Sequence, residues 1–250
     1  MKTTIIGSGN VATVLGRKIK AAGHDVLQVF SRNIHHAHFL GSELQCGVTD
    51  NIKSITNEAD IYLLAVNDAA IPEIAAMLGF KKGLVLHSAG SVPGSILKTC
   101  SANYGVLYPL QSLRKHKAIY LDIPLLVDGN TADALCLTTD FAGSISGRVK
   151  VTDDITRLKM HLAAVVVNNF TNHLYSLAAD YCDKEQLDFC LLKPLIEETA
   201  MRLEHHDPRQ LQTGPAVRKD LETIEKHLEL LANNAPLLKI YEMMTESIKP

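Results

Sequence analysis

The chain has 250 residues and nearly balanced charge, with 25 basic and 27 acidic side chains and a formal net charge of −2. This balance argues against a nucleic-acid-binding surface. The longest charge-poor stretch, 160–179, holds too many polar residues for a membrane span. Five widely spaced cysteines without a C-x-x-C pair indicate free thiols in a reducing cytosol. The chain enters a predicted strand within its first few residues, so we expect no secretory signal and a cytoplasmic protein.

Residues 1–152 alternate short apolar runs with helical patterns. The runs are rich in β-branched residues and are apolar on both faces, which is typical of strands in a parallel sheet covered by helices. We therefore predict an α/β fold, with an N-terminal Rossmann dinucleotide-binding domain over residues 1–152. The predicted strands are 4–6, 26–30, 61–66, 84–87, 106–107, 125–127 and 149–151.

Helical periodicity replaces the strand pattern after residue 152. Thr152 or Asp153 is suited to cap a long helix that ends near Cys182. We predict an all-helical C-terminal domain over residues 153–250, packed against the first domain because no Gly/Ser linker separates the two. Its further helices are 185–204, with Pro194 as a kink or break, 215–231 and 235–248.

A glycine-rich loop follows the first strand directly and opens a helix, in the pattern G-x-G-x-x-A. Gly7 permits the tight turn, Gly9 lets the backbone approach a pyrophosphate, and Ala12 lets the helix pack close to the strand. The first-turn N–H groups and the helix dipole favour the phosphates. A purely structural glycine turn is the alternative. The dinucleotide contacts predicted here are Gly7, Ser8, Gly9, Asn10 and Val11.

The second strand ends without the acidic residue that NAD enzymes use to hold the ribose hydroxyls. Ser31 and Arg32 stand there instead. A hydroxyl and a guanidinium suit the 2′-phosphate of NADP(H), so we predict that cofactor. The alternative is that Arg32 is simply solvated.

Three later strand ends complete the predicted site, because ligands of open α/β sheets bind beyond the carboxyl ends of strands. Ala65, Val66 and Asn67 are predicted to contact the cofactor, as is Ser88. His87, Tyr108 and Gln111 are placed near the substrate. His87 could instead be a satisfied, half-buried histidine, and Tyr108 could serve packing alone. These seven residues come from the strand ends at 61–66, 84–87 and 106–107.

The long helix carries uncharged polar residues on one stripe, with His161, Asn168, Asn172 and Tyr175 spaced by 7, 4 and 3 residues. Segment 160–179 has no charged residue, whereas solvent-facing stripes normally carry Lys and Glu. The stripe therefore suits a cleft between domains or a subunit interface. A buried polar network without a ligand is the alternative.

Arg218 follows a Gly-Pro turn and is predicted to bind an anionic substrate or cofactor group. An ion pair within the domain would explain it equally well. We predict no metal site. The histidines at 35, 36 and 38 have no carboxylate cluster beside them, and those at i and i+1 point apart on a helix.

These motifs together resemble Rossmann-like proteins that carry a C-terminal domain of unknown function, related to pyrroline-5-carboxylate reductases and deazaflavin-dependent NADP reductases. The helical half is similar to the 6-phosphogluconate dehydrogenase C-terminal type. The resemblance implies an NADP-dependent oxidoreductase acting on a small molecule, and a homodimer joined through the helical domains. It rests on the segments 7–12, 65–68, 87–90, 108–111, 161–168 and 214–220.

The chain departs from related β-hydroxyacid dehydrogenases, which place a catalytic lysine four residues before an asparagine on this helix. Ala164 and Val165 stand four residues before Asn168 and Asn169. His161 is then the nearest acid/base candidate. Where the resembled family has His before Pro, this chain has Tyr108.

Two functions remain open on the sequence. The first is a reductase of a C=O or C=N substrate in the interdomain cleft, with His161 or Tyr108 supplying the proton and Asn168 or Arg218 orienting the substrate. The second is a non-catalytic NADP(H)-binding sensor or scaffold, which the absent lysine motivates.

Overall fold

A computed structural model describes residues 1–80, 82–116 and 122–249 of the chain. It divides into two compact units, Met1–Val166 and Val167–Pro250. The sequence suggested a boundary at residue 152, whereas the division falls further along, inside the long helix. The first turn of that helix is fastened to the first unit, since Arg157 is only 1% exposed and donates to the Val92 carbonyl at 2.6 Å. This turn therefore belongs to the first unit.

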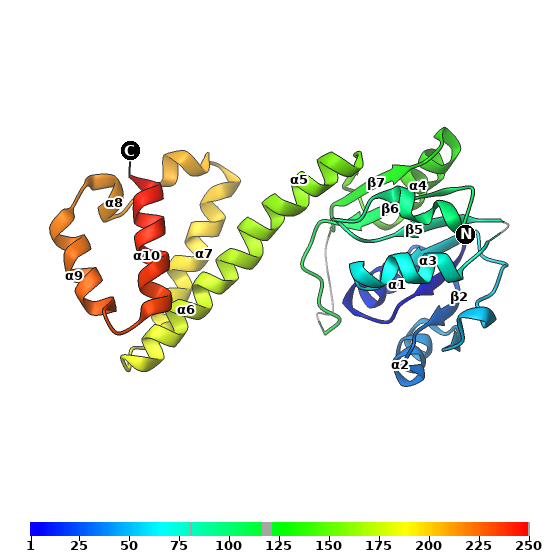
Figure 1. Ribbon diagram of the computed structural model, residues 1–250, viewed down its shortest axis with the longest axis horizontal. Helices are drawn as coiled ribbons and strands as arrows, with labels where there is room; N and C mark the ends of the chain where they lie inside the picture. The colour runs from blue at the N-terminus through cyan, green and yellow to red at the C-terminus, as the bar shows by residue number, and fades with distance from the viewer. Residues whose placement is uncertain (81, 117–121, 250) are drawn as a thin grey trace. The chain divides into compact units, whose positions relative to one another are not determined.

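The first unit is built on an eight-stranded sheet in the order β3-β2-β1-β4-β5-β6-β7-β8 (Figure 1). Every neighbouring pair is parallel except the antiparallel pair β6–β7. All seven predicted strands are present, and the short edge strand β3 is an addition. The strands are β1 (Lys2–Ile6), β2 (Asp25–Phe30), β3 (Gly47–Thr49), β4 (Ile61–Leu64), β5 (Leu84–His87), β6 (Tyr104–Pro109), β7 (Leu125–Gly129) and β8 (Val149–Val151).

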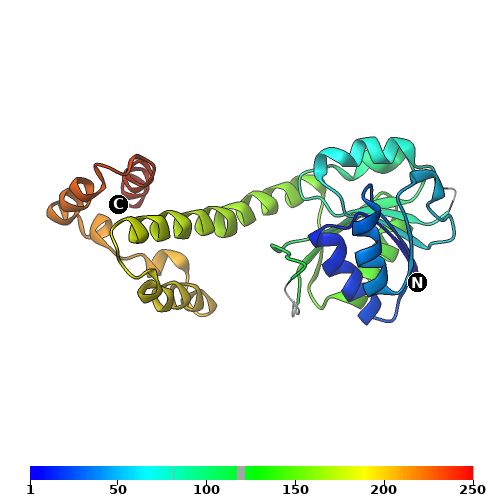
Figure 2. The same ribbon diagram turned by 90° about the horizontal axis from the view of Figure 1, so that it is seen from below.

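Helices cover both faces of the sheet, which confirms the predicted α/β fold (Figure 2). Side chains alternate along β4, so that Leu63 packs beneath one layer and Leu64 beneath the other. One layer consists of α1 (Asn10–Ala21), α2 (Ile34–Leu44) and α4 (Ala132–Ile145). The other holds α3 (Ile71–Met77) and the 3₁₀ helix η3 (Gly94–Thr99).

The long helix starts where the sequence predicts, because Asp153 caps it by accepting a hydrogen bond from the Thr156 N–H at 2.6 Å. It runs as α5 (Asp154–Ala164), a π-helical stretch η4 (Val165–Phe170) and α6 (Thr171–Lys184). A π-turn bonds i to i+5 and changes the register of the side chains. The predicted stripe assumed uniform α-helical spacing from His161 onward, and that assumption is wrong across η4.

Two predicted helices of the second unit are divided. Of the two alternatives for Pro194, the break holds, because Pro194 stands in the first turn of α7 (Lys193–Met201), where its missing N–H leaves no hydrogen bond unmade. Lys219 adopts a left-handed φ of 56°, which separates α8 (Pro215–Arg218) from α9 (Leu221–Leu231). The chain ends in α10 (Ala235–Ile248), as predicted. Among the described residues, no helix combines the length and apolarity needed to cross a bilayer.

Candidate functional site

The glycine loop lies at the point where the strand order reverses, between β1 and β4. Gly7 has a left-handed φ of +126°, and a Cβ on it would stand 2.1 Å from the Ala65 carbonyl oxygen. No other residue fits there. Gly9, the N-cap of α1, has open space within 4 Å of the position a Cβ would take. The backbone can therefore approach a pyrophosphate, with no side chain at the cap to compete for the first-turn N–H groups.

A cavity of about 590 Å³ opens over this loop, within the size range of small-molecule sites. The ends of β1, β2 and β4 all contribute to its wall. Ten of the eleven residues predicted to contact the cofactor line it: Gly7, Ser8, Gly9, Asn10, Val11, Ser31, Arg32, Ala65, Val66 and Asn67. The dimensions and the bare glycine backbone fit a dinucleotide.

The two residues predicted at the end of β2, Ser31 and Arg32, have different surroundings. Ser31 is only 9% exposed, and its hydroxyl oxygen accepts a hydrogen bond from the Ser8 hydroxyl at 2.8 Å. It therefore braces the glycine loop. Arg32 is exposed on the cavity wall together with His36, from the first turn of α2. His36 was not predicted from the sequence, yet it adds an imidazole beside the guanidinium.

Tyr108 and His161 form a pair on the same edge of the sheet. The Tyr108 hydroxyl lies 2.9 Å from Nδ1 of His161, and the rings meet edge to face with centroids 5.8 Å apart. Gly90 packs against both rings, since a Cβ on it would stand 2.9 Å from each. Tyr108 comes from β6 and His161 from α5, so the two predicted acid/base candidates are in direct contact.

Burial raises the pKa of the Tyr108 phenol, and the negative charge of Asp68 raises it further, while Arg157 opposes both effects. The phenol is therefore protonated at neutral pH and able to donate its proton. Asp68 itself accepts a hydrogen bond from the Ser91 hydroxyl at 2.6 Å.

His87, Ser88 and Gln111 stand apart from these groups. The sequence placed His87 near the substrate, whereas its ring is completely buried and its Nδ1 accepts the Ala89 N–H at 3.2 Å. Ser88 donates to the Leu64 carbonyl at 3.3 Å, between β4 and β5. Gln111 is exposed and accepts from the Ser112 N–H at 2.9 Å. His87 is thus a support beneath the site.

Asn168, Asn172 and Arg218 belong to the second unit. All three are exposed on it. Their predicted roles toward the substrate stay predictions.

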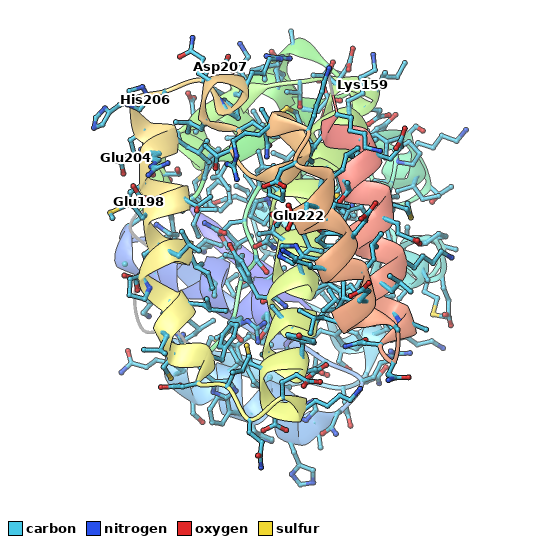
Figure 3. The ribbon with its side chains drawn as sticks, turned by 90° about the vertical axis from the view of Figure 1, so that its left-hand side faces the viewer. Lys159, Glu198, Glu204, His206, Asp207 and Glu222 are labelled. Atoms are coloured by element: carbon cyan, nitrogen blue, oxygen red, sulfur yellow. The ribbon has the colours of Figure 1, made fainter. Side chains whose placement is uncertain are left out.

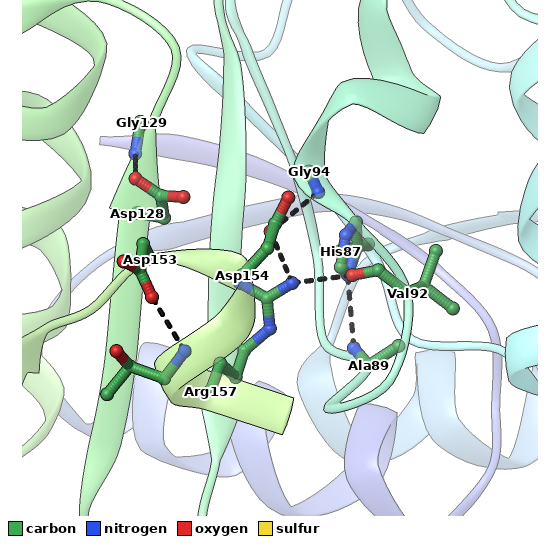
Figure 4. Close-up of polar contacts among 10 residues, drawn as sticks. His87, Ala89, Val92, Gly94, Asp128, Gly129, Asp153, Asp154 and Arg157 are labelled. Carbon is green, nitrogen blue, oxygen red and sulfur yellow. Dashed lines mark hydrogen bonds and ion pairs between the residues drawn. The ribbon is translucent and has the colours of Figure 1, made fainter. Parts of the chain in front are cut away.

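Sequence reasoning missed Asp154 and Arg157, whose bonds cross to the loop after β5 (Figure 4). A signal was available, because Asp154, Arg157 and His161 follow the i, i+3, i+7 spacing of one helix face. Among the described residues there is no group of three or more His, Cys, Asp or Glu side chains suited to a metal ion.

The fold and the site define a Rossmann-type dinucleotide-binding protein with a helical C-terminal part. Residues 123–248 match the family described as a domain of unknown function, DUF2520, and the chain belongs to that family. Residues 2–89 match the family described as NADP oxidoreductase, coenzyme F420-dependent. Both matches confirm the resemblance drawn from the motifs.

The chain is similar over almost its whole length to a solved structure from Bacteroides fragilis described as an NADP oxidoreductase. The two are 33% identical, with a TM-score of 0.92 and coverage of 99% and 97% of the two chains. A pyrroline-5-carboxylate reductase from Streptococcus pyogenes shares the fold, at 15% identity, a TM-score of 0.69 and coverage of 100% and 98%. A cyclohexadienyl dehydrogenase from Zymomonas mobilis is 28% identical over 189 residues, which span 65% of this chain and 63% of the dehydrogenase.

The buried His87 ring makes stability depend on pH. Burial, together with the charge of Arg157, lowers its pKa to about 4, against about 6.5 in an unfolded chain. Between these values the unfolded state binds more protons, so the free energy of unfolding falls as the pH is lowered from 6.5 to 4. We expect a loss of up to about 3 kcal/mol across this window from His87 alone.

Substitution His87→Asn keeps an acceptor for the Ala89 N–H and removes the titrating ring, so it should flatten this dependence. Urea unfolding followed by circular dichroism at pH 7 and pH 4.5 measures it. His38→Asn, at an exposed position of α2, is the matched control. Equal losses in the wild type and in His87→Asn would contradict the assignment.

Proposed function

We propose that the protein is an NADP(H)-dependent oxidoreductase that reduces a C=O or C=N bond of a small molecule. The observation that carries the proposal is the Tyr108–His161 pair at the same sheet edge as the dinucleotide cavity. Its relatives support the reaction class, since they are described as an NADP oxidoreductase and a dehydrogenase. The Tyr108–His161 contact also favours a catalytic role over the sensor or scaffold reading.

The geometry supports separate tasks for the chain's residues. The cofactor, held at Gly7, Gly9 and Arg32, would supply the hydride when bound. Tyr108 would donate its phenolic proton to the oxygen or nitrogen of the reduced bond. His161, bonded to the phenol through Nδ1, would orient the hydroxyl and return a proton to it from solvent. Gly90 leaves both rings room to meet.

Loss of the phenol should lower turnover without weakening the cofactor complex. We expect Tyr108→Phe to reduce kcat for NADPH oxidation by about 10²-fold or more, because general acid catalysis contributes on that scale. His161→Ala should also lower kcat. The measurement is NADPH oxidation against a panel of ketones, aldehydes and imines, alongside cofactor binding by calorimetry.

The control is Tyr241→Phe, which removes a phenol that lies 2.8 Å from Nδ1 of His227 in the second unit. Turnover that survives both Tyr108→Phe and His161→Ala would remove the pair from the mechanism. Tight cofactor binding without turnover on any substrate would favour the sensor or scaffold function.

The preference for NADP(H) over NAD(H) rests on Arg32, with His36 beside it on the cavity wall. A guanidinium matches the geometry of a phosphate group. We expect Arg32→Ala to weaken NADPH binding by about 10- to 100-fold, since hydrogen bonds to charged groups contribute about 1.5–3 kcal/mol. NADH binding should change little.

Binding isotherms for both cofactors test this expectation. Lys20→Ala, in the last turn of α1 away from the cavity, serves as the charge-matched control. Equal affinities for the two cofactors that do not respond to Arg32→Ala would contradict the preference.

We also propose that the protein is a homodimer through its helical unit. The described part of that unit buries few apolar side chains, with Ile224 and Leu231 among them. Figure 3 shows the side chains of this unit, in which the labels Glu198 and Glu204 locate α7 and the 3₁₀ turn after it. Many large apolar side chains in this unit stay exposed, although monomers rarely leave large apolar patches uncovered. They are Val167, Phe170, Tyr175, Leu187, Leu191, Leu192, Leu195, Met201, Leu203, Val217, Leu221, Leu230, Met243 and Met244.

A second copy with the same surface can cover such residues in a symmetric contact, in which each substitution counts twice. We expect light scattering to give twice the 27.4 kDa chain mass, and Leu191→Glu to weaken the dimer by about 10-fold or more. Leu191 is 78% exposed, and the control Phe39→Glu alters an apolar side chain that is 67% exposed in α2. A monomeric wild type would contradict this proposal. It would indicate that another part of the same chain covers these apolar side chains.

A further inference from the structure

Arg157 is the largest fully buried side chain of the described residues, with 1% of its surface exposed. Its Nη2 donates to the Val92 carbonyl and to Oδ1 of Asp154, each at 2.6 Å. Its Nε and Nη1 have no hydrogen-bond partner among the residues that the structure describes. Figure 4 shows the guanidinium lying between Asp154 and the backbone of Val92.

This arrangement is not expected to increase the free energy of unfolding. Buried donors without partners cost free energy, and replacing a buried ion pair by apolar side chains of similar volume is often neutral or stabilising. Asp154, the one ion-pair partner of the guanidinium among the described residues, is itself 42% exposed, so the pair gains little from a dry environment. The position of Arg157 therefore calls for a reason beyond folding.

The bonds of Arg157 and Asp154 converge on one short loop, residues 88–94, which runs from the end of β5 to the first residue of η3. Oδ1 of Asp154 accepts the Gly94 N–H at 3.0 Å as well as the guanidinium. The Val92 carbonyl takes the other bond from Arg157. We call these four groups the Arg157 clamp: the Arg157 guanidinium, the Asp154 carboxylate, the Val92 carbonyl and the Gly94 N–H. It fastens the loop to the first turn of α5.

The same loop carries Gly90, which packs so closely against the Tyr108 and His161 rings that a Cβ on it would stand 2.9 Å from each ring. His161 stands four residues after Arg157 on α5, one helical turn away on the same face. The clamp therefore ties α5, one turn before His161, to the loop whose Gly90 contacts both rings. If the loop moved relative to α5, Gly90 would move relative to the two rings and disturb the 2.9 Å hydrogen bond between Tyr108 and His161.

We propose that Arg157 is a positioning residue, which holds the loop 88–94 on α5 and so keeps the Tyr108 hydroxyl and His161 Nδ1 in hydrogen-bonding geometry. Its effect on turnover rests on the proposed function of that pair. Its effect on the loop and on the His161 ring does not.

The test compares Arg157→Met, Arg157→Lys and the control Lys159→Met, which removes an exposed charge from the same helix. Amide hydrogen exchange of residues 88–94 reports the loop, and ring resonances of His161, identified by their loss in His161→Ala, report the pair. Neither measurement needs substrate or cofactor. Steady-state kinetics and NADPH binding are measured on the same proteins.

We expect Arg157→Met to speed exchange of the Gly94 amide by about 10-fold or more and to shift the His161 resonances. It should lower kcat by about 10- to 100-fold, as small misplacements of catalytic groups do, with NADPH affinity unchanged. Arg157→Lys, which keeps a charge and a donor, should recover part of all three effects. Lys159→Met should match the wild type.

Should Arg157→Met fail to fold, Asp154→Ala removes the Gly94 acceptor at a half-exposed position and is expected to give the same pattern. Unchanged exchange, or faster exchange with unmoved His161 resonances, would overturn the proposal. Unchanged kcat in an active enzyme would also overturn it. A wild type without turnover would defeat the proposed function, while the exchange and resonance data would still decide the role of Arg157.

Discussion

Parallel hydrogen bonding from β2 through β1, β4 and β5 to β6 is the constraint on which the site depends. Parallel pairing brings the carboxyl ends of all five strands to one edge of the sheet. At that edge the chain must turn back into helices on both faces, and the reversal of strand order between β1 and β4 opens the cavity. Gly7 makes this junction possible, because its missing Cβ leaves room for the carbonyl of Ala65.

Two polar side chains, His87 and Arg157, are buried beneath this edge, where removing a polar group from water costs free energy. His87 is completely buried and Arg157 almost so, and the charge of Arg157 contributes to the lowered pKa of His87. The same charge opposes the rise in the pKa of the Tyr108 phenol. Natural proteins tolerate strained or costly groups chiefly where function depends on them. His87 and Arg157 are the buried groups of the sheet's carboxyl edge that can carry charge, and their position below Tyr108 and His161 is consistent with a reactive site there.

Much of the fold could be predicted from local patterns. Seven strands, the glycine loop and the Asp153 cap each follow from a few neighbouring residues whose preferences agree. The edge strand β3 was not predicted, since its three residues are too few to show the periodicity of a strand. The stripe on the long helix failed for a different reason, because nothing local in its sequence announces the π-turn at η4. The two alternatives for His87 could not be separated from the sequence, because a strand end can point into the core as readily as into the site, and the structure buries the ring completely.

The sequence by itself therefore determined the class of fold, the dinucleotide loop and the residue types available at each strand end. These depend on backbone preferences and on side-chain spacing within a turn or a strand. Only the tertiary structure decided that Tyr108 meets His161, 53 residues away, and that Arg157 holds Val92, 65 residues away. Such contacts depend on strand order and on the path of the loops between strands. Short-range chemistry does not encode either, because the free energy that selects them comes from packing the whole sheet and its two helical layers.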